Sequence, residues 1–154
     1  MDLLIKVLPG MVAAVLGSFL AAKWSMKKFY SEKWWDRKEH AYVEIVDALY
    51  DVLRYCEIKK EDYGQGTGYS SDTESELSSR HAAAYWKIKR ATDVGAFVIS
   101  EEAQNVLREL RDRPRLRWDD NPDWDIYEAD YEAHRDALQQ IVELARKDLG
   151  AKNA

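Results

Sequence analysis

The chain contains few of the residues that interrupt helices. Its 154 residues include only 7 glycines and 3 prolines. Turn-rich β folds use such residues at many chain reversals, so their low number favours an all-helical fold. There is one cysteine, Cys56, which excludes an internal disulfide. Cys56 falls on an apolar helical stripe, so we expect it to fill the core rather than to act as a reactive thiol.

Sequence motifs that carry chemistry are also missing. Three glycines lie within residues 64–68, but no Gly-Lys-Ser or Gly-Lys-Thr follows them and no strand is predicted before them. A phosphate-binding loop is therefore excluded, and we predict a flexible connector. The three histidines, His40, His81 and His134, match no metalloprotease signature and lie among polar neighbours, so we expect them on the surface. We predict no catalytic residue, no metal site and no cofactor.

The distribution of charge divides the chain into two parts. The formal net charge is -5, yet residues 23–38 contain six cations and two anions. A basic segment beside an apolar one suits anionic lipid head groups. The remainder of the chain is acidic, which removes any general electrostatic reason to bind nucleic acid, and no nucleic-acid partner is expected.

A long apolar run lies at the start of the chain. The 20 residues from Leu3 to Ala22 contain one charge, Lys6. A helix of that length spans about 30 Å, the thickness of the hydrocarbon core of a bilayer. A cleaved signal peptide is the alternative, but the run is long for one, no small-x-small cleavage site follows, and the flank after it is positive. A second alternative is a buried helix of a soluble core, but the strongly basic segment that follows at residues 23–38 argues against it. We therefore expect residues 1–22 to be a transmembrane anchor of a single-pass protein.

Aromatic and basic side chains follow this run where an interfacial belt would lie. The residues expected at the membrane interface are Lys23, Trp24, Lys27, Lys28, Tyr30, Trp34 and Trp35. The excess of positive charge then predicts a cytoplasmic location for residues 39–154 and an external N-terminus. Small residues recur at every fourth position, at Ala13, Gly17 and Ala21, a spacing that lets two membrane helices pack closely.

The pattern of apolar residues after residue 38 predicts a set of amphipathic helices. The helix predicted over 38–57 has a stripe of apolar positions at Tyr42, Ile45, Val46, Leu49, Val52, Leu53 and Cys56. A loop is predicted over 61–73, a helix over 73–98, a short helix over 101–112 that begins after Ser100, and a final helix over 122–149. The apolar run 94–99 is expected to be the deepest point of the domain.

These helices predict an antiparallel three- to four-helix bundle over residues 39–154. No glycine or proline separates the anchor from the first bundle helix. We therefore expect the juxtamembrane segment, residues 23–38, to be helical and the two helices to be continuous.

The only concentrated basic feature of the bundle is a run of alternating arginines, Arg111, Arg113, Arg115 and Arg117. Arginine forks bind phosphates and carboxylates, so this segment is a possible anion-binding site. Asp119, Asp120 and Asp123 follow at once, and the alternative is a surface loop whose charge is locally balanced.

Parts of the chain resemble known proteins. The stretches are Ser31-Glu-Lys-Trp-Trp-Asp-Arg-Lys with Ala41-Tyr42 and Ile45-Val-Asp-Ala-Leu, Arg90-Ala-Thr-Asp-Val-Gly-Ala-Phe-Val-Ile-Ser-Glu-Glu-Ala, and Ala145-Arg-Lys-Asp-Leu-Gly. They are similar to a group of small uncharacterised bacterial proteins with one N-terminal membrane helix and a helical domain. The resemblance implies a bacterial inner membrane and carries no activity.

Three functional hypotheses remain open. In the first, the bundle of a single-pass inner-membrane protein binds an unknown protein partner or a second copy of itself. In the second, the protein is a membrane effector or sensor that an anionic small molecule gates through the arginine segment or the cations of the middle helix. In the third, it is a metal-dependent enzyme that uses the histidines.

Overall fold

The computed structural model describes the backbone of residues 2–66 and 68–150, and side chains from residue 23 onward except at 27, 28, 30, 31, 65, 67, 96 and 151–154. Within this part the fold is all-helical and has no strand, as predicted. The elements are α1 (Asp2–Gln65), α2 (Ser71–Val94), the single-turn 3-10 helix η1 (Gly95–Phe97), α3 (Glu101–Asp112) and α4 (Asp123–Gly150). The chain divides into two compact units, Met1–Arg37 and Lys38–Ala154.

The helix α1 has no break between Lys23 and Lys38, so the predicted helical juxtamembrane segment is confirmed at the level of secondary structure. Its end was predicted too early. The helix continues to Gln65, and the connector is only the few residues before Ser71. Gly66 stops the helix because its φ of 62° is left-handed, and its N–H donates to the carbonyl of Asp62 over 2.7 Å. Gly64 is tolerated within the last turn.

Helix α2 begins at Ser71, two residues before the predicted start at residue 73. The side chain of Ser70 accepts a hydrogen bond from the backbone N–H of Thr73. Helix α3 begins where the sequence predicts, because the Ser100 side chain accepts from the N–H of Ala103 over 3.3 Å. Arg113 and Pro114 end it, since the residue before a proline avoids helical geometry.

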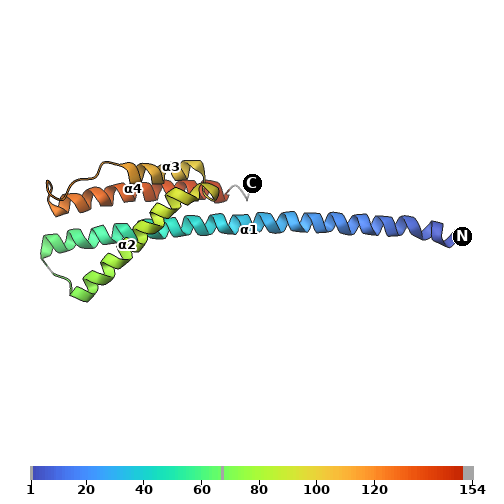
Figure 1. Cartoon of the computed structure of the whole chain (residues 1–154), viewed down its shortest axis with the longest axis horizontal. Helices are drawn as coiled ribbons and strands as arrows, with labels where there is room; N and C mark the ends of the chain where they lie inside the picture. Colours follow the sequence, from blue (N-terminus) through green and yellow to red (C-terminus); the bar gives the residue numbers. More distant parts are fainter. Residues whose placement is uncertain (1, 67, 151–154) are drawn as a thin grey trace. The chain divides into compact units, whose positions relative to one another are not determined.

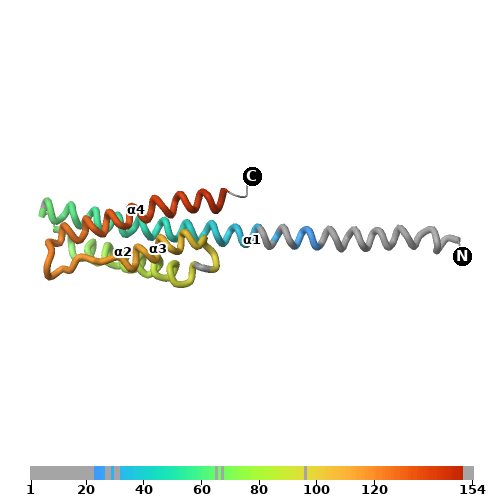
Figure 2. Tube along the Cα trace, turned by 90° about the horizontal axis from the view of Figure 1, so that it is seen from above, coloured from blue at the N-terminus to red at the C-terminus, as the bar shows by residue number. Residues whose placement is uncertain are grey.

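The helices of the second unit alternate in direction. The part of α1 from Lys38 onward runs against α2, α2 against α3, and α3 against α4, as the colours from cyan to red show (Figure 1). Helix α3 packs along α4, and α2 with η1 packs on α3. In the second view α4 lies on one side of this part of α1, and α2 and α3 lie on the other (Figure 2).

The core lies where these four helices meet. The predicted stripe of α1 is confirmed: Tyr42, Ile45, Leu49, Val52, Leu53 and Cys56 are buried, and Val46 is partly buried. The other helices contribute Ala84, Ile88, Ile99, Ala103, Leu107, Leu110, Ala137 and Ile141. Burial raises the pKa of the Cys56 thiol to about 12, as expected of a cysteine that fills a core.

The run 94–99 was predicted to be the deepest point, and that prediction is wrong. Phe97 is 76% exposed and Val94 is 55% exposed, and Ile99 alone is buried among the side chains of this run that the structure describes. The reason is that α2 ends at Val94 and the chain turns through η1, which changes the direction of successive side chains. Ile99 folds back onto Gly95, where an added Cβ would lie 3.1 Å from its Cδ1 atom.

Candidate functional site

Two grooves follow the seam between α1 and α2 on the outside of the bundle. The larger has a volume of about 460 Å³ and lies beside the C-terminal half of α2. Its apolar lining consists of Ala41, Ile45, Ala91, Val94, Gly95, Val98 and Ile99. The smaller, of about 250 Å³, lies beside the N-terminal half of α2 and is lined by Tyr50, Asp51, Arg54, Tyr55, Leu77 and Arg80.

Charges of opposite sign line the two sides of this seam. From Glu39 to Asp51, α1 contains four acidic residues and no lysine or arginine. From Leu77 to Thr92, α2 contains four cations and no acidic residue. The larger groove has Glu44 on its α1 side and Lys87 and Arg90 on its α2 side. In the smaller groove, Asp51 and Arg54 stand on α1 and Arg80 on α2, and the charge of Arg54 is balanced by Glu57 at 2.8 Å.

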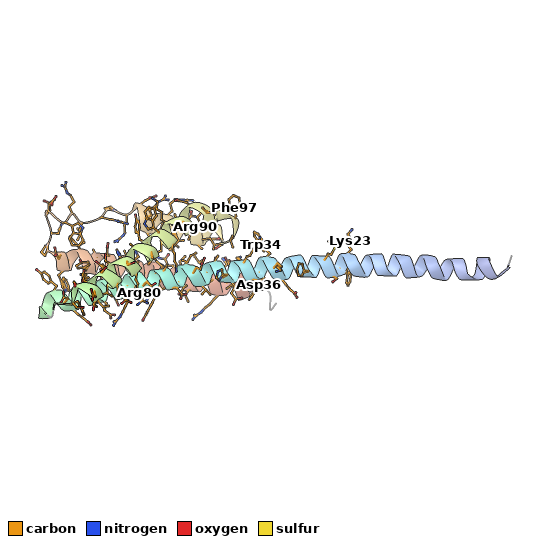
Figure 3. The ribbon with its side chains drawn as sticks, turned by 60° about the horizontal axis from the view of Figure 1, so that its bottom comes forward. Lys23, Trp34, Asp36, Arg80, Arg90 and Phe97 are labelled. Atoms are coloured by element: carbon orange, nitrogen blue, oxygen red, sulfur yellow. The ribbon has the colours of Figure 1, made fainter. Side chains whose placement is uncertain are left out.

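We use the term α1–α2 face for the side chains at this seam. They are Glu44, Tyr50, Asp51 and Arg54 of α1 and Arg80, Lys87, Arg90 and Val94 of α2, to which we add the exposed Phe97 of η1, the next element along the chain. Arg80 and Arg90 lie toward the two ends of α2, and Phe97 lies just beyond its C-terminal end (Figure 3). The face thus combines an acidic helix, a basic helix and exposed apolar side chains.

Most charges of this face have no ion pair in the described part of the chain. Glu44 Oε1 lies 3.7 Å from His40 Nε2. Arg54 pairs with Glu57 at 2.8 Å, whereas Asp51, Arg80, Lys87 and Arg90 take part in none of the ion pairs among the described residues. Exposed charges are usually solvated, so this alone would be unremarkable. Here the charges are sorted by sign along two adjacent helices and border apolar grooves, which is typical of a binding surface.

The predicted arginine segment is arranged differently. Arg111 bonds Asp93 at 3.0 Å and Asp112 at 2.7 Å, Arg113 bonds Asp130, and Arg117 lies within 3.6 Å of Asp119 and Asp120. The guanidinium of Arg115 lies 5.6 Å from the ring centre of Tyr85.

An anion at this segment would have to displace internal carboxylates. The cavity beside it, lined by Arg111, Arg115 and His134, has a volume of only about 20 Å³. The anion site therefore stays a prediction without geometric support.

The histidines do not all lie on the surface, contrary to expectation. His40 is exposed, but His134 is 7% exposed and its Nδ1 lies 2.6 Å from the carbonyl oxygen of Asp130. His81 stacks on Tyr55 with 4.1 Å between ring centres. Burial lowers the pKa of both His81 and His134. The buried residues of α4 are Ile126, His134, Ala137 and Ile141, and Leu138 is partly buried against the core.

No group of three or more histidine, cysteine, aspartate or glutamate side chains within the described residues is placed to hold a metal ion. The pairs at one-turn spacing are His40 with Glu44 and His134 with Asp130, and the second meets a backbone carbonyl rather than a carboxylate.

The predicted membrane-interface residues belong to the first unit. Trp24 is 80% exposed, and Lys23 and Trp34 are exposed, while Trp35 is partly buried. Lys23, Trp34 and Asp36 follow one another along α1 (Figure 3). The side chains of Lys27, Lys28 and Tyr30, and those of Ala13, Gly17 and Ala21, lie outside the described residues. In the part of the chain whose side chains are described, no helix has the length and apolar character needed to span a bilayer.

The sequence reasoning noticed the cations of α2 but missed the acids of α1. Both signals are visible in the sequence as stretches of one charge sign. Their meaning depends on the packing of α1 beside α2, which puts the two stretches on one surface.

Comparison with known proteins leaves the chain without an assigned family: no family model, no curated protein and no solved structure matches it.

Proposed function

We propose that the chain is a single-pass protein of a bacterial inner membrane whose helical bundle is a protein-interaction module, and that the partner binds at the α1–α2 face. The anchor rests on the apolar run Leu3–Ala22 and its basic, aromatic flank. The resemblance to small bacterial proteins with one membrane helix agrees with that placement.

The observation that carries the interaction role is the groove of about 460 Å³ between α1 and α2, with its apolar lining and charged rim. Monomeric soluble surfaces rarely keep apolar residues clustered beside unpaired charges, whereas interfaces combine an apolar centre with a polar rim. Phe97 and Val94 add exposed apolar area at the end of this groove.

Photo-cross-linking tests the interaction role in native membranes. A photoreactive residue replaces Lys87 at the rim of the larger groove, and a matched variant carries it in place of Arg146, an exposed cation of α4. A covalent adduct with another polypeptide is expected from position 87 and not from position 146. Absence of any adduct from position 87 would refute the interaction role of this face.

Fractionation tests the anchor separately. The full chain should sediment with membranes and resist alkaline carbonate extraction, and deletion of residues 1–30 should release a soluble helical protein. Recovery of the full chain in the cytosol would refute the membrane placement without bearing on the face.

A further inference from the structure

The charge pattern of the α1–α2 face restricts what can bind there. Glu44 and Asp51 lie on the α1 side, where Arg54 is balanced by Glu57, and Arg80, Lys87 and Arg90 lie on the α2 side. The acidic group belongs to α1 and the basic group to α2, which runs in the opposite direction and crosses α1 at an angle (Figure 1). A partner that matches the face must therefore be basic along one line and acidic along the next.

We propose that this partner is a second copy of the chain, related to the first by a two-fold axis that runs along the seam between α1 and α2. The inference rests on the proposed interaction role of the face and names the partner.

A two-fold axis in this position makes the contact self-complementary. Rotation by 180° about it puts α1 of one copy opposite α2 of the other, and the same contact forms twice. Within one chain Glu44 shares a groove with Lys87 and Arg90, and Asp51 shares a groove with Arg80. Rotation about an axis along the seam leaves each residue at the same position along that axis. Glu44 therefore meets Arg90 of the second copy, and Asp51 meets its Arg80.

Apolar side chains have a defined place in this contact. Val94 and Phe97 lie at the end of the larger groove, which is lined by Ala41, Ile45 and Ala91. Burial of the large exposed side chains supplies the hydrophobic part of the association, while the paired charges determine orientation.

Other occupants match only half of the face. An anionic bilayer surface would attract Arg80, Lys87 and Arg90, but it would be repelled by Glu44 and Asp51 at the same seam. A bilayer is also flat and would leave the grooves unfilled. An acidic peptide meets the same repulsion from α1.

Charge reversal with the full chain tests the proposal. One variant reverses the acidic side (Glu44→Lys with Asp51→Lys), and the other reverses the basic side (Arg80→Glu with Arg90→Glu). The readout is the yield of chain-to-chain adduct from the photoreactive residue at position 87, because that yield reports this face even if anchor helices also associate. Circular dichroism verifies that each variant is folded.

Each variant alone should lose at least about ten-fold in adduct yield, because every reversed pair occurs twice in the two-fold contact. An equimolar mixture of the two variants, with the photoreactive residue in one and an epitope tag in the other, should restore the yield. The control variant Arg146→Glu with Lys147→Glu changes the charge by the same amount on exposed positions of α4 and should leave the yield unchanged.

The outcomes separate this proposal from the interaction role itself. Unchanged yield in both reversed variants, or a mixture that does not restore it, overturns the two-fold contact. An adduct from position 87 that contains a different polypeptide overturns the second copy as partner but leaves the interaction role standing. An adduct that contains only lipid also overturns the second copy as partner. No adduct at all overturns both.

Discussion

Replacement of Tyr42 by phenylalanine should destabilise the bundle by about 2 kcal/mol. The Tyr42 side chain is buried, and its hydroxyl joins three helices. It donates to the carboxylate of Asp148 on α4, lies 3.1 Å from Ser100 Oγ, and accepts a hydrogen bond from the Ser100 N–H over 3.3 Å. Ser100 is the N-cap of α3 and follows Val98 and Ile99, which line the larger groove. The hydroxyl therefore also positions one wall of the α1–α2 face.

The magnitude follows from the charge on Asp148. A hydrogen bond to a charged group contributes roughly 1.5–3 kcal/mol, and phenylalanine keeps the ring, so little cavity forms. For a domain of this size about 2 kcal/mol corresponds to a fall in melting temperature of roughly 8 °C. Tyr50→Phe is the matched control, since Tyr50 is exposed on the same helix and should change the melting temperature by less than about 2 °C.

The destabilisation should also depend on pH. Burial opposes the charged form of Asp148, but hydrogen bonds from Tyr42, Ser100 and Lys38 outweigh it and lower the pKa of Asp148 below its ordinary value. A carboxyl whose pKa is lower in the folded state stabilises the fold above its unfolded pKa, and this contribution is lost as pH falls through the folded pKa. The difference between the wild type and Tyr42→Phe should thus be full at pH 7 and shrink below about pH 4.

Thermal and urea unfolding followed by near-ultraviolet circular dichroism measures both effects, and the variant Asp148→Asn completes a double-mutant cycle with Tyr42→Phe. A coupling energy above about 1 kcal/mol is expected. A loss below about 0.5 kcal/mol for Tyr42→Phe, or a loss of constant size from pH 7 to pH 3, would refute the role given to this hydroxyl.

Two further predictions concern buried titratable groups. Burial lowers the pKa of His134 below the ordinary value for histidine, about 6.5, so protonation favours the unfolded chain and stability should fall as pH drops below that value. His134→Gln should reduce the dependence of the free energy of unfolding on pH between pH 7 and pH 5. His40→Gln, at an exposed position, should retain the pH dependence of the wild type. Equal pH dependence in the wild type and both variants would contradict the burial argument. Burial raises the pKa of Cys56 to about 12, so maleimide at pH 8 should label this thiol only when the bundle opens. Labelling at the rate of a free thiol in the absence of denaturant would show that the core is not closed.

Helix periodicity explains which structural expectations succeeded. The stripe from Tyr42 to Cys56 is strongly amphipathic, and the structure buries it as predicted. Ser100 before Glu101 and Glu102 predicts the start of α3 because capping is a local interaction between neighbouring residues. The length of α1 was underestimated because polar composition after residue 60 suggests a loop, whereas the helix stops only at the left-handed Gly66.

The failed expectations concern positions where local chemistry and tertiary packing disagree. Phe97 and Val94 are apolar, yet the turn through η1 leaves them exposed. His134 is polar, yet α4 packs on α3 along the face that contains it, and the Asp130 carbonyl satisfies its ring nitrogen. Neither outcome can be read from periodicity, because each depends on which neighbouring helix covers which face.

The sequence by itself determined the helical class, the core stripe of α1 and the two stretches of opposite charge, because each is a pattern among residues within a few turns of one another. Only the tertiary structure decided that the acidic stretch of α1 and the basic stretch of α2 share one surface with a groove between them. The physical reason is that Tyr55 of α1 stacks on His81 of α2, while Ala84 and Ile88 of α2 are buried in one core cluster with the apolar stripe of α1. That contact brings residues 44 and 90 to one groove, although 46 positions of chain separate them.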